Sequence, residues 1–334
     1  TAKMIKKYGI RRLLLALDAD TSIDRKALIS ELEALSVPVQ TVPSMSELVA
    51  GRARINDIRD LELEDLLGRD PVRTEAEVLA ASLRGKSVMV TGAGGSIGSE
   101  LCRQIIHHKP KTLVLLEQNE YSLYSIEREL SAVNDIDGLG VSIFPILGSV
   151  IHRRRCEVVM RAFAVETVYH AAAYKHVPLV EHNPNEGILT NTLGTRNVAE
   201  ACRAAGVTTM VLISTDKAVN PANVMGASKR LAECYCQALE TLPLDKRGAT
   251  RFVTVRFGNV LGSTGSVVPL FKRQLEAGGP LTVTHEGITR YFMTIAEAVE
   301  LVLQSAELGR HGVTEGGKIF VLDMGRPVKI IDLA

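Results

Sequence analysis

A hydroxyl, a carboxyl and an amine follow one another directly at Thr215, Asp216 and Lys217. These groups can donate and accept protons, which is the chemistry of general acid–base catalysis. The apolar run 210–213 precedes them and predicts a buried strand, so the three side chains stand at its carboxyl end. Ligands of open parallel sheets bind outside the carboxyl ends of the strands. We therefore expect the three residues to face a substrate; a structural turn is the alternative for the Asp216–Lys217 pair.

Two more candidates for the catalytic group begin the next predicted helix. Met225 and Lys229 are four residues apart, so they share one helix face. For Lys229 the alternative is an ordinary surface lysine. Methionine has no proton to transfer, so Met225 can only shape the pocket.

A glycine-rich turn joins a predicted strand at 88–90 to a helix expected from Ser99. Gly92, Gly95 and Gly98 have GxxGxxG spacing, which is typical of a dinucleotide site. Gly92 permits the tight turn, Gly95 lets the backbone approach a pyrophosphate, and Gly98 lets the helix pack close to the sheet. The amide groups at the helix N-terminus can then bind phosphate. The predicted site also includes Ser96 and Ile97.

Further cofactor-binding candidates follow the next strands. Glu117 stands nineteen residues beyond Gly98, where a carboxylate hydrogen-bonds both ribose hydroxyls of NAD and repels the extra phosphate of NADP. A solvated acid at a strand end is the alternative. The third strand precedes Ser149 and Val150, which we place at the adenine, and the fourth precedes the small residues Ala171, Ala172 and Ala173, for which a packing role is the alternative. The pattern predicts NAD as the cofactor.

Lys175 and His176 also follow the fourth strand, so both should face the cleft. Lys175 could hold substrate hydroxyls or phosphate, or it could be only a loop charge. His176 is a candidate substrate-binding residue, although a structural histidine fits the sequence as well.

The elements that position these residues alternate between strand and helix. Apolar strands are predicted at 88–90, 113–116, 141–147, 167–170, 210–213, 253–256 and 319–322, and helical segments separate most of them. This alternation predicts an α/β fold with a doubly wound parallel sheet of the Rossmann type. Past Gly258 the alternation becomes irregular, which suits a smaller C-terminal substrate lobe. After Arg326-Pro327 a final helix is expected to begin.

The domain organisation follows from these elements. Residues 1–68 read as the remnant of an N-terminal α/β domain, with strands at 12–17 and 37–42 and helices at 23–35 and 45–50. Residues 69–85 form a linker, and 86–258 form the NAD-binding domain. Residues 259–318 are mainly the substrate lobe, and 319–334 are the returning strand and the start of a truncated helix. Both chain ends look cut, so the lack of a membrane segment in this chain says little about the parent protein.

Composition narrows the class of partner. Lys+Arg number 39 and Asp+Glu number 38, so no broad electrostatic field attracts nucleic acid or an anionic membrane. The five cysteines match no zinc spacing, and no metal site is predicted. We expect reduced thiols and a cytoplasmic location.

Several strings together resemble a known family. They are Ser214-Thr-Asp-Lys-Ala218 with Pro221, Asn223 and Gly226-x-x-Lys229; the strings His170–Pro178 and Arg256–Val260; and Gly265–Phe271. This chain resembles the extended short-chain dehydrogenase/reductases. Within them it is similar to the UDP-N-acetylglucosamine 4,6-dehydratases of bacterial surface-polysaccharide synthesis. The large members of that family carry transmembrane helices, so the resemblance implies a parent anchored to the bacterial inner membrane.

The resemblance implies a reaction and assigns roles within it. NAD oxidises the sugar at C4, water leaves across C5 and C6, and hydride returns to C6. Lys217 would be the base at C5, Asp216 the acid for the 6-hydroxyl, Thr215 the ligand of the 4-hydroxyl, and Lys229 the ligand of the nicotinamide ribose. The wider superfamily has a tyrosine where this chain has Met225, and the large dehydratases share the methionine.

The same resemblance implies a site for the nucleotide end of the UDP-sugar. Its expected residues are Asn259, Ser266 and Val267, with Arg290 for the diphosphate because a guanidinium fork suits phosphate. A solvated arginine is the alternative for Arg290. The rival activities are a nucleotide-sugar 4-epimerase, which needs no C5 base or C6 acid, and an NAD-binding regulator without chemistry. A homo-oligomer is possible by analogy of fold alone.

Overall fold

The computed structural model describes residues 2–15, 32, 35, 37–42, 59–60, 82–242, 250–263, 267–283, 285–311, 318–325 and 327–332. The chain forms two compact units, Thr1–Pro71 and Val72–Ala334. Among the described residues, no helix combines the length and apolar character needed to cross a membrane.

The first unit contains a short helix and a three-stranded sheet. Helix α1 (Ala2–Tyr8) precedes β1 (Leu13–Leu15), which pairs in parallel with β2 (Val39–Thr41). Both strands lie within the strands predicted there. The sequence did not predict α1, or β3 (Arg59–Asp60), which pairs with β2 in the antiparallel sense. The predicted helices at 23–35 and 45–50 lie outside the described residues, apart from two isolated positions in the first of them.

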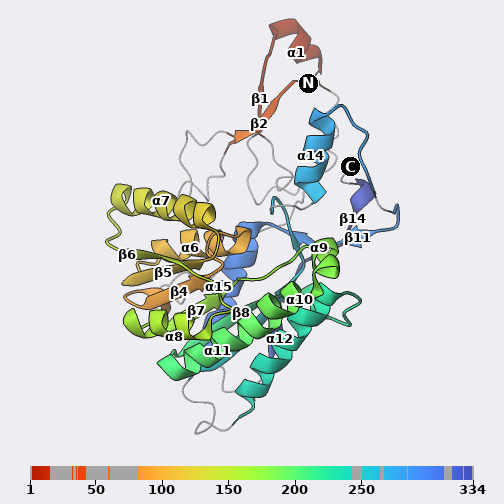
Figure 1. The fold of residues 1–334 in the computed structure, drawn as a ribbon. Helices are drawn as coiled ribbons and strands as arrows, with labels where there is room; N and C mark the ends of the chain where they lie inside the picture. The colour runs from red at the N-terminus through yellow and green to blue at the C-terminus, as the bar shows by residue number, and fades with distance from the viewer. Residues whose placement is uncertain are drawn as a thin grey trace. The chain divides into compact units, whose positions relative to one another are not determined.

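The second unit is built on a seven-stranded parallel sheet (Figure 1). Its strand order is β13-β9-β8-β7-β4-β5-β6. The strands are β4 (Ser87–Thr91), β5 (Thr112–Glu117), β6 (Ser142–Leu147), β7 (Thr167–His170), β8 (Thr209–Thr215), β9 (Arg251–Phe257) and β13 (Ile319–Val321). Each predicted strand of this sheet is thus present; β7 has the predicted bounds, and the ends of the other strands differ by at most two residues. The order reverses between β4 and β7, and such a switch point opens a crevice for a ligand.

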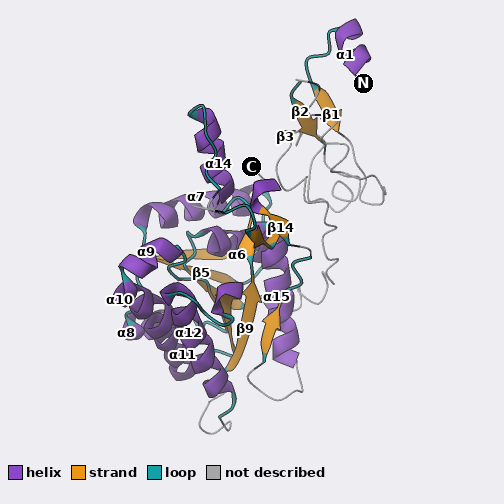
Figure 2. Cartoon of the chain, turned by 90° about the vertical axis from the view of Figure 1, so that its right-hand side faces the viewer, coloured by secondary structure: helices purple, strands orange, loops and turns teal. Residues whose placement is uncertain are grey.

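Helices cover both faces of this sheet, as its uninterrupted apolar strands require. One face packs α6 (Ser96–His107), α7 (Glu120–Ile136) and α15 (Ile295–His311) against the strands. The other face packs α8 (Arg153–Ala162), α11 (Gly194–Ala205) and α12 (Val224–Glu240). Figure 2 shows α11 and α12 on one side of the sheet and α15 on the other. Along β4, Val88 and Val90 join the first core, while Met89 joins the second, which is the two-residue period of a strand.

Two boundaries of this unit differ in detail from the sequence reading. Helix α6 begins at Ser96, three residues before the expected start, because Gly95 takes an extended conformation and serves as its N-cap residue. Residues 69–81 of the predicted linker lie outside the described residues, and Leu83, near its end, is buried in the sheet core.

Short elements beyond β9 complete the unit. Strand β10 (Asn259–Val260) pairs in parallel with β12 (Phe292–Met293), and α14 (Val267–Glu276) lies between them in the chain. The expected final helix after Pro327 is wrong for the described residues. Strand β14 (Val328–Lys329) stands there and pairs with β11 (Thr289–Arg290), and only one 3₁₀ turn (Ile330–Asp332) follows. Pairing with β11 holds residues 328 and 329 in an extended conformation, and this outweighs the helix preference that the local sequence indicates.

Candidate functional site

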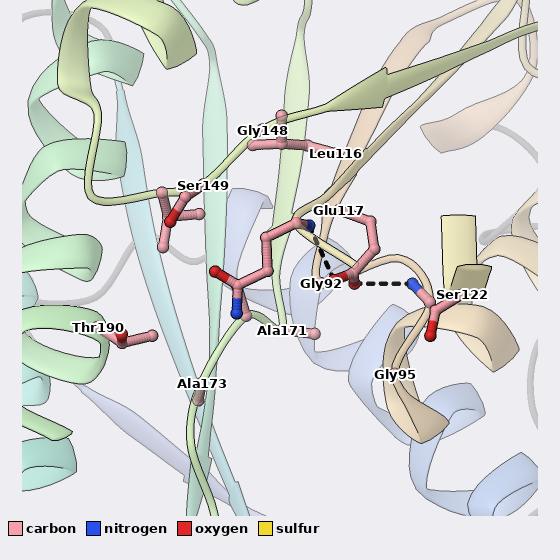
Figure 3. A pocket seen from close by; sticks show the side chains of 14 residues that line it. Gly92, Gly95, Leu116, Glu117, Ser122, Gly148, Ser149, Ala171, Ala173 and Thr190 are labelled. Carbon is pink, nitrogen blue, oxygen red and sulfur yellow. Dashed lines mark hydrogen bonds between the residues drawn. The ribbon is translucent and has the colours of Figure 1, made fainter. Parts of the chain in front are cut away.

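A pocket of about 200 Å³ opens where β4, β5, β6 and β7 end (Figure 3). Loops after these four strands supply its walls, as the strand order predicts for a ligand site. Eight of the predicted cofactor-binding residues line it: Gly92, Gly95, Glu117, Ser149, Val150, Ala171, Ala172 and Ala173. The structure therefore gathers most of the predicted cofactor site in one place.

The glycine-rich turn needs its glycines for three different reasons. Gly92 has φ +66°, and a Cβ there would lie 2.7 Å from the Ala172 backbone. A Cβ on Gly98 would lie 1.9 Å from the Gly92 carbonyl oxygen, so Gly98 lets α6 pack against the turn. Gly95 has more room, since its Cβ would meet only that same oxygen at 3.3 Å. These contacts match the roles that the spacing predicts for close helix packing and an open approach to the backbone.

The first residues of α6 contribute through the backbone. Ser96 is the first residue of the helix, and Ile97 packs against the core beside it. Neither is among the residues that line the pocket, so their predicted contact with the cofactor can come only from the helix N-terminus.

Sequence reasoning missed Gly94, the remaining glycine of the turn. It lines the pocket, and a Cβ there would lie 2.4 Å from the Cβ of Ser122 on α7. Its amide also donates to Glu117 Oε2 at 3.1 Å. The run Gly94-Gly95 could have indicated this close approach, but the GxxGxxG spacing drew attention to its neighbours.

Glu117 is buried at the pocket rim and already has partners. Oε2 accepts from Gly94, and Oε1 accepts from the amides of Gln118 and Asn119 at 2.8 and 2.9 Å. A carboxylate offers about four acceptor positions, so about one remains for a ligand.

A buried histidine, which the sequence reading did not single out, ties the pocket to the sheet. His170 Nδ1 lies 2.7 Å from Thr91 Oγ1, and Nε2 lies 3.0 Å from Thr195 Oγ1. Burial, and secondarily the charge of Lys229, lower the pKa of His170 to about 3, so the ring is neutral. Thr195 donates its proton to the Asn191 carbonyl, so His170 must donate from Nε2 and accept from Thr91 at Nδ1. The neutral ring thus joins β4, β7 and α11 through two hydrogen bonds.

The predicted catalytic residues at the end of β8 form one hydrogen-bonded cluster. Thr215 Oγ1 donates to Asp216 Oδ1 at 2.9 Å, and Lys217 Nζ donates to the same oxygen at 2.9 Å. Lys217 Nζ also lies 2.9 Å from Asn259 Oδ1, on β10. The structure thus brings Asn259 to the Lys217 amine, and its predicted contact with the nucleotide end of the substrate stays a prediction. A carboxyl, an amine and a hydroxyl stand together here, half-buried, and such groups can exchange protons.

Helix α12 packs its first turn directly against this cluster. Asn223 caps the helix by accepting from the Gly226 amide at 2.8 Å. A Cβ on Gly226 would lie only 2.2 Å from the Lys217 carbonyl oxygen, so a glycine is required for this approach. Met225 lies in the same turn and is buried, with 3% of its surface exposed, and its predicted role in shaping the pocket stays a prediction.

Lys229 lies one turn further along α12 and is buried. Its Nζ donates to the Ile213 carbonyl at 2.6 Å, which leaves two N–H groups for a ligand. Burial lowers the pKa of Lys229 to about 8, and Glu233 opposes the shift. The buried position excludes the reading of Lys229 as an ordinary surface lysine.

A buried ion-pair network behind β8 escaped the sequence reading. Glu233 is fully buried and accepts from Ser214 Oγ at 2.6 Å, from Arg256 at 2.7 and 2.5 Å, and from Arg230 at 3.1 Å. Burial alone would raise the pKa of Glu233, but the hydrogen bonds, that of Arg256 first, lower it below its usual range. The network fixes Ser214 directly before the catalytic residues. The partners come from three separate elements, so no local pattern indicates them.

The loop after β7 is held against α12 by Asn191, which the sequence reading also missed. Asn191 lies in a π-helical turn (Ile188–Leu193) and is fully buried. Its side chain accepts from the Tyr174 amide at 2.8 Å and donates to the Tyr174 carbonyl at 2.9 Å and to Ser228 Oγ at 3.0 Å. Lys175 follows Tyr174, and its pKa is lowered, first by partial burial and second by the Lys217 cation. The predicted contact of Lys175 with the substrate stays a prediction.

The remaining substrate-binding candidates lie on other elements. His176 is the N-cap residue of α9 (Val177–His182) and is half-buried. Val267 is the first residue of α14, and Ser266 lies outside the described residues. Arg290 is exposed on β11 and donates only to the Thr289 carbonyl among the bonds described. The structure leaves these predicted contacts as predictions.

A parallel sheet of this order, with a glycine-rich turn after β4 at the switch point, is a Rossmann-type fold of the dinucleotide-binding class. The chain belongs to the polysaccharide biosynthesis protein family, whose profile matches residues 88–334.

Curated relatives refine this membership. The capsular polysaccharide biosynthesis protein CapD of Staphylococcus aureus is 47% identical over 336 residues, which cover 99% of this chain and 53% of CapD. A UDP-N-acetylglucosamine 4,6-dehydratase (inverting) of Campylobacter jejuni is 36% identical over 239 residues, covering 71% of this chain and 66% of that protein. A UDP-glucose 4-epimerase of Rickettsia akari is 35% identical over 227 residues, covering 68% and 64%. The family thus includes nucleotide-sugar dehydratases and epimerases.

Among solved structures, the fold is similar to DesIV, a dTDP-glucose 4,6-dehydratase of Streptomyces venezuelae crystallised with NAD. The TM-score is 0.61 at 20% identity, and the match covers 74% of this chain and 78% of DesIV. The chain itself spans about half the length of the curated relatives that it matches over nearly its full length.

Proposed function

We propose that this protein is an NAD-dependent 4,6-dehydratase of UDP-N-acetylglucosamine that serves surface-polysaccharide synthesis. The observation that carries the proposal is the cluster of Thr215, Asp216 and Lys217 at the end of β8. Removal of water across C5 and C6 needs a base for carbon and an acid for the leaving hydroxyl. A 4-epimerase, which only oxidises and reduces C4, needs neither group.

The pocket at the ends of β4, β5, β6 and β7 has the features of a dinucleotide site. The cradle of Gly92, Gly94 and Gly95 leaves no side chain over the turn, and the N-terminus of α6 supplies amides for the pyrophosphate. Glu117 would accept from one adenosine-ribose hydroxyl. Lys229 would donate its two remaining N–H groups to the nicotinamide ribose. When bound, NAD would accept a hydride from C4 of the sugar and later return it to C6.

The chain's own residues would manage the protons of this reaction. Thr215 would bind the 4-hydroxyl and pass its proton through Asp216 or water, since Met225 has none to exchange. The resulting ketone acidifies the hydrogen at C5, which neutral Lys217 would accept. Protonated Asp216 would give its proton to the 6-hydroxyl, which leaves as water. The sugar loses one water in total, and the cofactor ends as it began.

Product mass provides the test. Incubation with UDP-N-acetylglucosamine and NAD should yield a nucleotide sugar lighter by one water. Lys217→Ala should still bind the UDP-sugar but release water about 10²–10⁴-fold more slowly. An isomer of unchanged mass would instead indicate the 4-epimerase, which the similarity to the Rickettsia akari enzyme keeps as the second candidate. A protein that binds both ligands without turnover would contradict both activities.

A further inference from the structure

Two oxygen atoms from distant parts of the chain hold the Lys217 amine. Nζ lies 2.9 Å from Asp216 Oδ1 and 2.9 Å from Asn259 Oδ1. In this arrangement the Lys217 amine donates and the Asn259 amide accepts through its oxygen. The Asn259 backbone is itself fixed, because its amide donates to the Tyr291 carbonyl at 3.2 Å and its strand pairs with β12.

This arrangement matters most when Lys217 is neutral. An ammonium has three N–H bonds, whereas the neutral amine has two N–H bonds and one lone pair. Two acceptors occupy both N–H bonds of the neutral amine. The lone pair is then left in the one remaining tetrahedral direction.

The neighbouring acid is oriented by the same contacts. Asp216 Oδ1 accepts from both Thr215 and Lys217, so Oδ2 is the oxygen that can carry a proton. A Cβ on Gly258 would lie 3.5 Å from Oδ2 but only 2.6 Å from Met324 Sδ, so a glycine is needed where this loop passes the acid. Acid and base therefore each keep one reactive position.

We propose that Asn259 is a positioning residue for the removal of the C5 proton. Its side-chain oxygen and Asp216 Oδ1 occupy the two N–H bonds of neutral Lys217 and direct the lone pair at the sugar. The C5–H bond breaks, its proton joins Lys217, and its electron pair forms the second C5–C6 bond. The C6–O bond breaks, and the oxygen leaves as water with the Asp216 proton. This inference rests on the proposed function.

The obvious competing role for Asn259 is a hydrogen bond to the substrate's diphosphate. The two roles respond oppositely to Asn259→Asp, which keeps the side chain's shape and an acceptor oxygen but adds a negative charge. Beside Lys217, the charge stabilises the ammonium, so the free amine forms only at higher pH. Beside a diphosphate, the charge repels the substrate and raises KM.

The experiment compares parent protein, Asn259→Asp, Asn259→Leu and the control Asn185→Asp, which adds the same charge on exposed α10 (Pro184–Gly187). Three assays are run from pH 6 to 10: steady-state water release for kcat and KM, deuterium uptake at C5 from D₂O, and C4 oxidation in a single turnover from NADH absorbance. Thermal unfolding of each variant reports its folding.

We expect kcat of Asn259→Asp to fall about ten-fold at pH 7.5 and to recover as the pH rises by one to two units. KM should stay within about three-fold. Asn259→Leu should slow C5 exchange about ten-fold or more at every pH while C4 oxidation continues, and Asn185→Asp should match the parent.

Three results would overturn the inference. A raised KM with an unchanged pH profile would assign Asn259 to the diphosphate and leave the dehydratase function standing. Equal losses of C4 oxidation and C5 exchange, with a lower unfolding temperature, would assign it a general structural role. A parent protein that releases no water would remove the proposed function and this inference together.

Discussion

Gly226→Ala should separate the activity of this protein from its stability. The added Cβ would lie 2.2 Å from the Lys217 carbonyl oxygen, and carbon–oxygen contacts are comfortable at about 3.3–3.6 Å. The backbone of Lys217 and the first turn of α12 must therefore separate by about 1 Å. Unlike a flexible side chain, the carbonyl cannot rotate away alone. Lys217 would then leave the position set by Asp216 and Asn259.

The two consequences differ in size. Overpacking costs about 1–3 kcal/mol, while replacing a helical glycine by alanine returns about 1 kcal/mol, so the net loss of stability is about 0–2 kcal/mol. A misplacement of about 1 Å at reacting groups can cost about 10²-fold in rate. We expect Gly226→Ala to fold and to bind cofactor, but to release water about 10²-fold more slowly.

The matched control is a glycine-to-alanine change at another tight contact. Gly187→Ala places its Cβ 2.5 Å from the Cγ1 of Val180, a side chain that can adjust. We expect it to keep a rate within a few-fold of the parent. Urea unfolding gives the stability of each variant, and product mass over time gives the rate. If Gly226→Ala released water as fast as Gly187→Ala, the contact between α12 and Lys217 would not set the site's geometry.

Three further outcomes follow from the site. Glu117→Gln should weaken NAD binding about 5- to 30-fold in titrations. NADP binding should change less, because the variant lacks the negative charge that repels the extra phosphate. Equal affinity of the parent protein for both cofactors would contradict this. Thr215→Val should slow single-turnover C4 oxidation far more than Met225→Leu, since only threonine has a proton to relay, and the reverse order would exclude this proton route. Burial lowers the pKa of Lys229 to about 8 in the folded chain. Between about pH 8 and the usual lysine pKa, the unfolded chain therefore binds more protons than the folded chain. The contribution of Lys229 to the free energy of unfolding thus rises as the pH rises through that window. Urea unfolding should accordingly find Lys229→Met more stable relative to the parent at pH 7 than at pH 9.5, and a constant difference would mean that Lys229 is not buried as a charge.

The sheet was predictable because its information is local. Continuous apolar runs between helical segments give the seven strands, and the glycine turn after β4 gives the crevice at the switch point. The position of Glu117 at the end of β5 followed from its spacing to Gly98 alone.

The site's supports were not predictable for the opposite reason. Lys217 and Asn259 are 42 positions apart, and they meet only because β8 and β9 lie side by side in one register. The sequence analysis gave Glu233 no role, although it is the buried acceptor for Arg256. The wrong final helix has the same cause, since a partner strand decided the conformation of residues 328 and 329.

The π-helical turn that carries Asn191 makes the sequence intolerant of a shortening that would look harmless. A π turn holds one residue more than an α turn, so deleting one residue between 188 and 193 would let regular helix run on into α11. The backbone hydrogen bonding would become more regular. Every side chain on one flank of the deletion would rotate by about 100° relative to the other, because an α-helix has 3.6 residues per turn. Either Asn191 would leave the loop after β7 and α12, or the core face of α11 would turn away from the sheet. The π turn therefore lets one continuous helical segment hold Asn191 against the loop after β7 and α12 while the core face of α11 points to the sheet. An ideal helix of the same residues cannot do both.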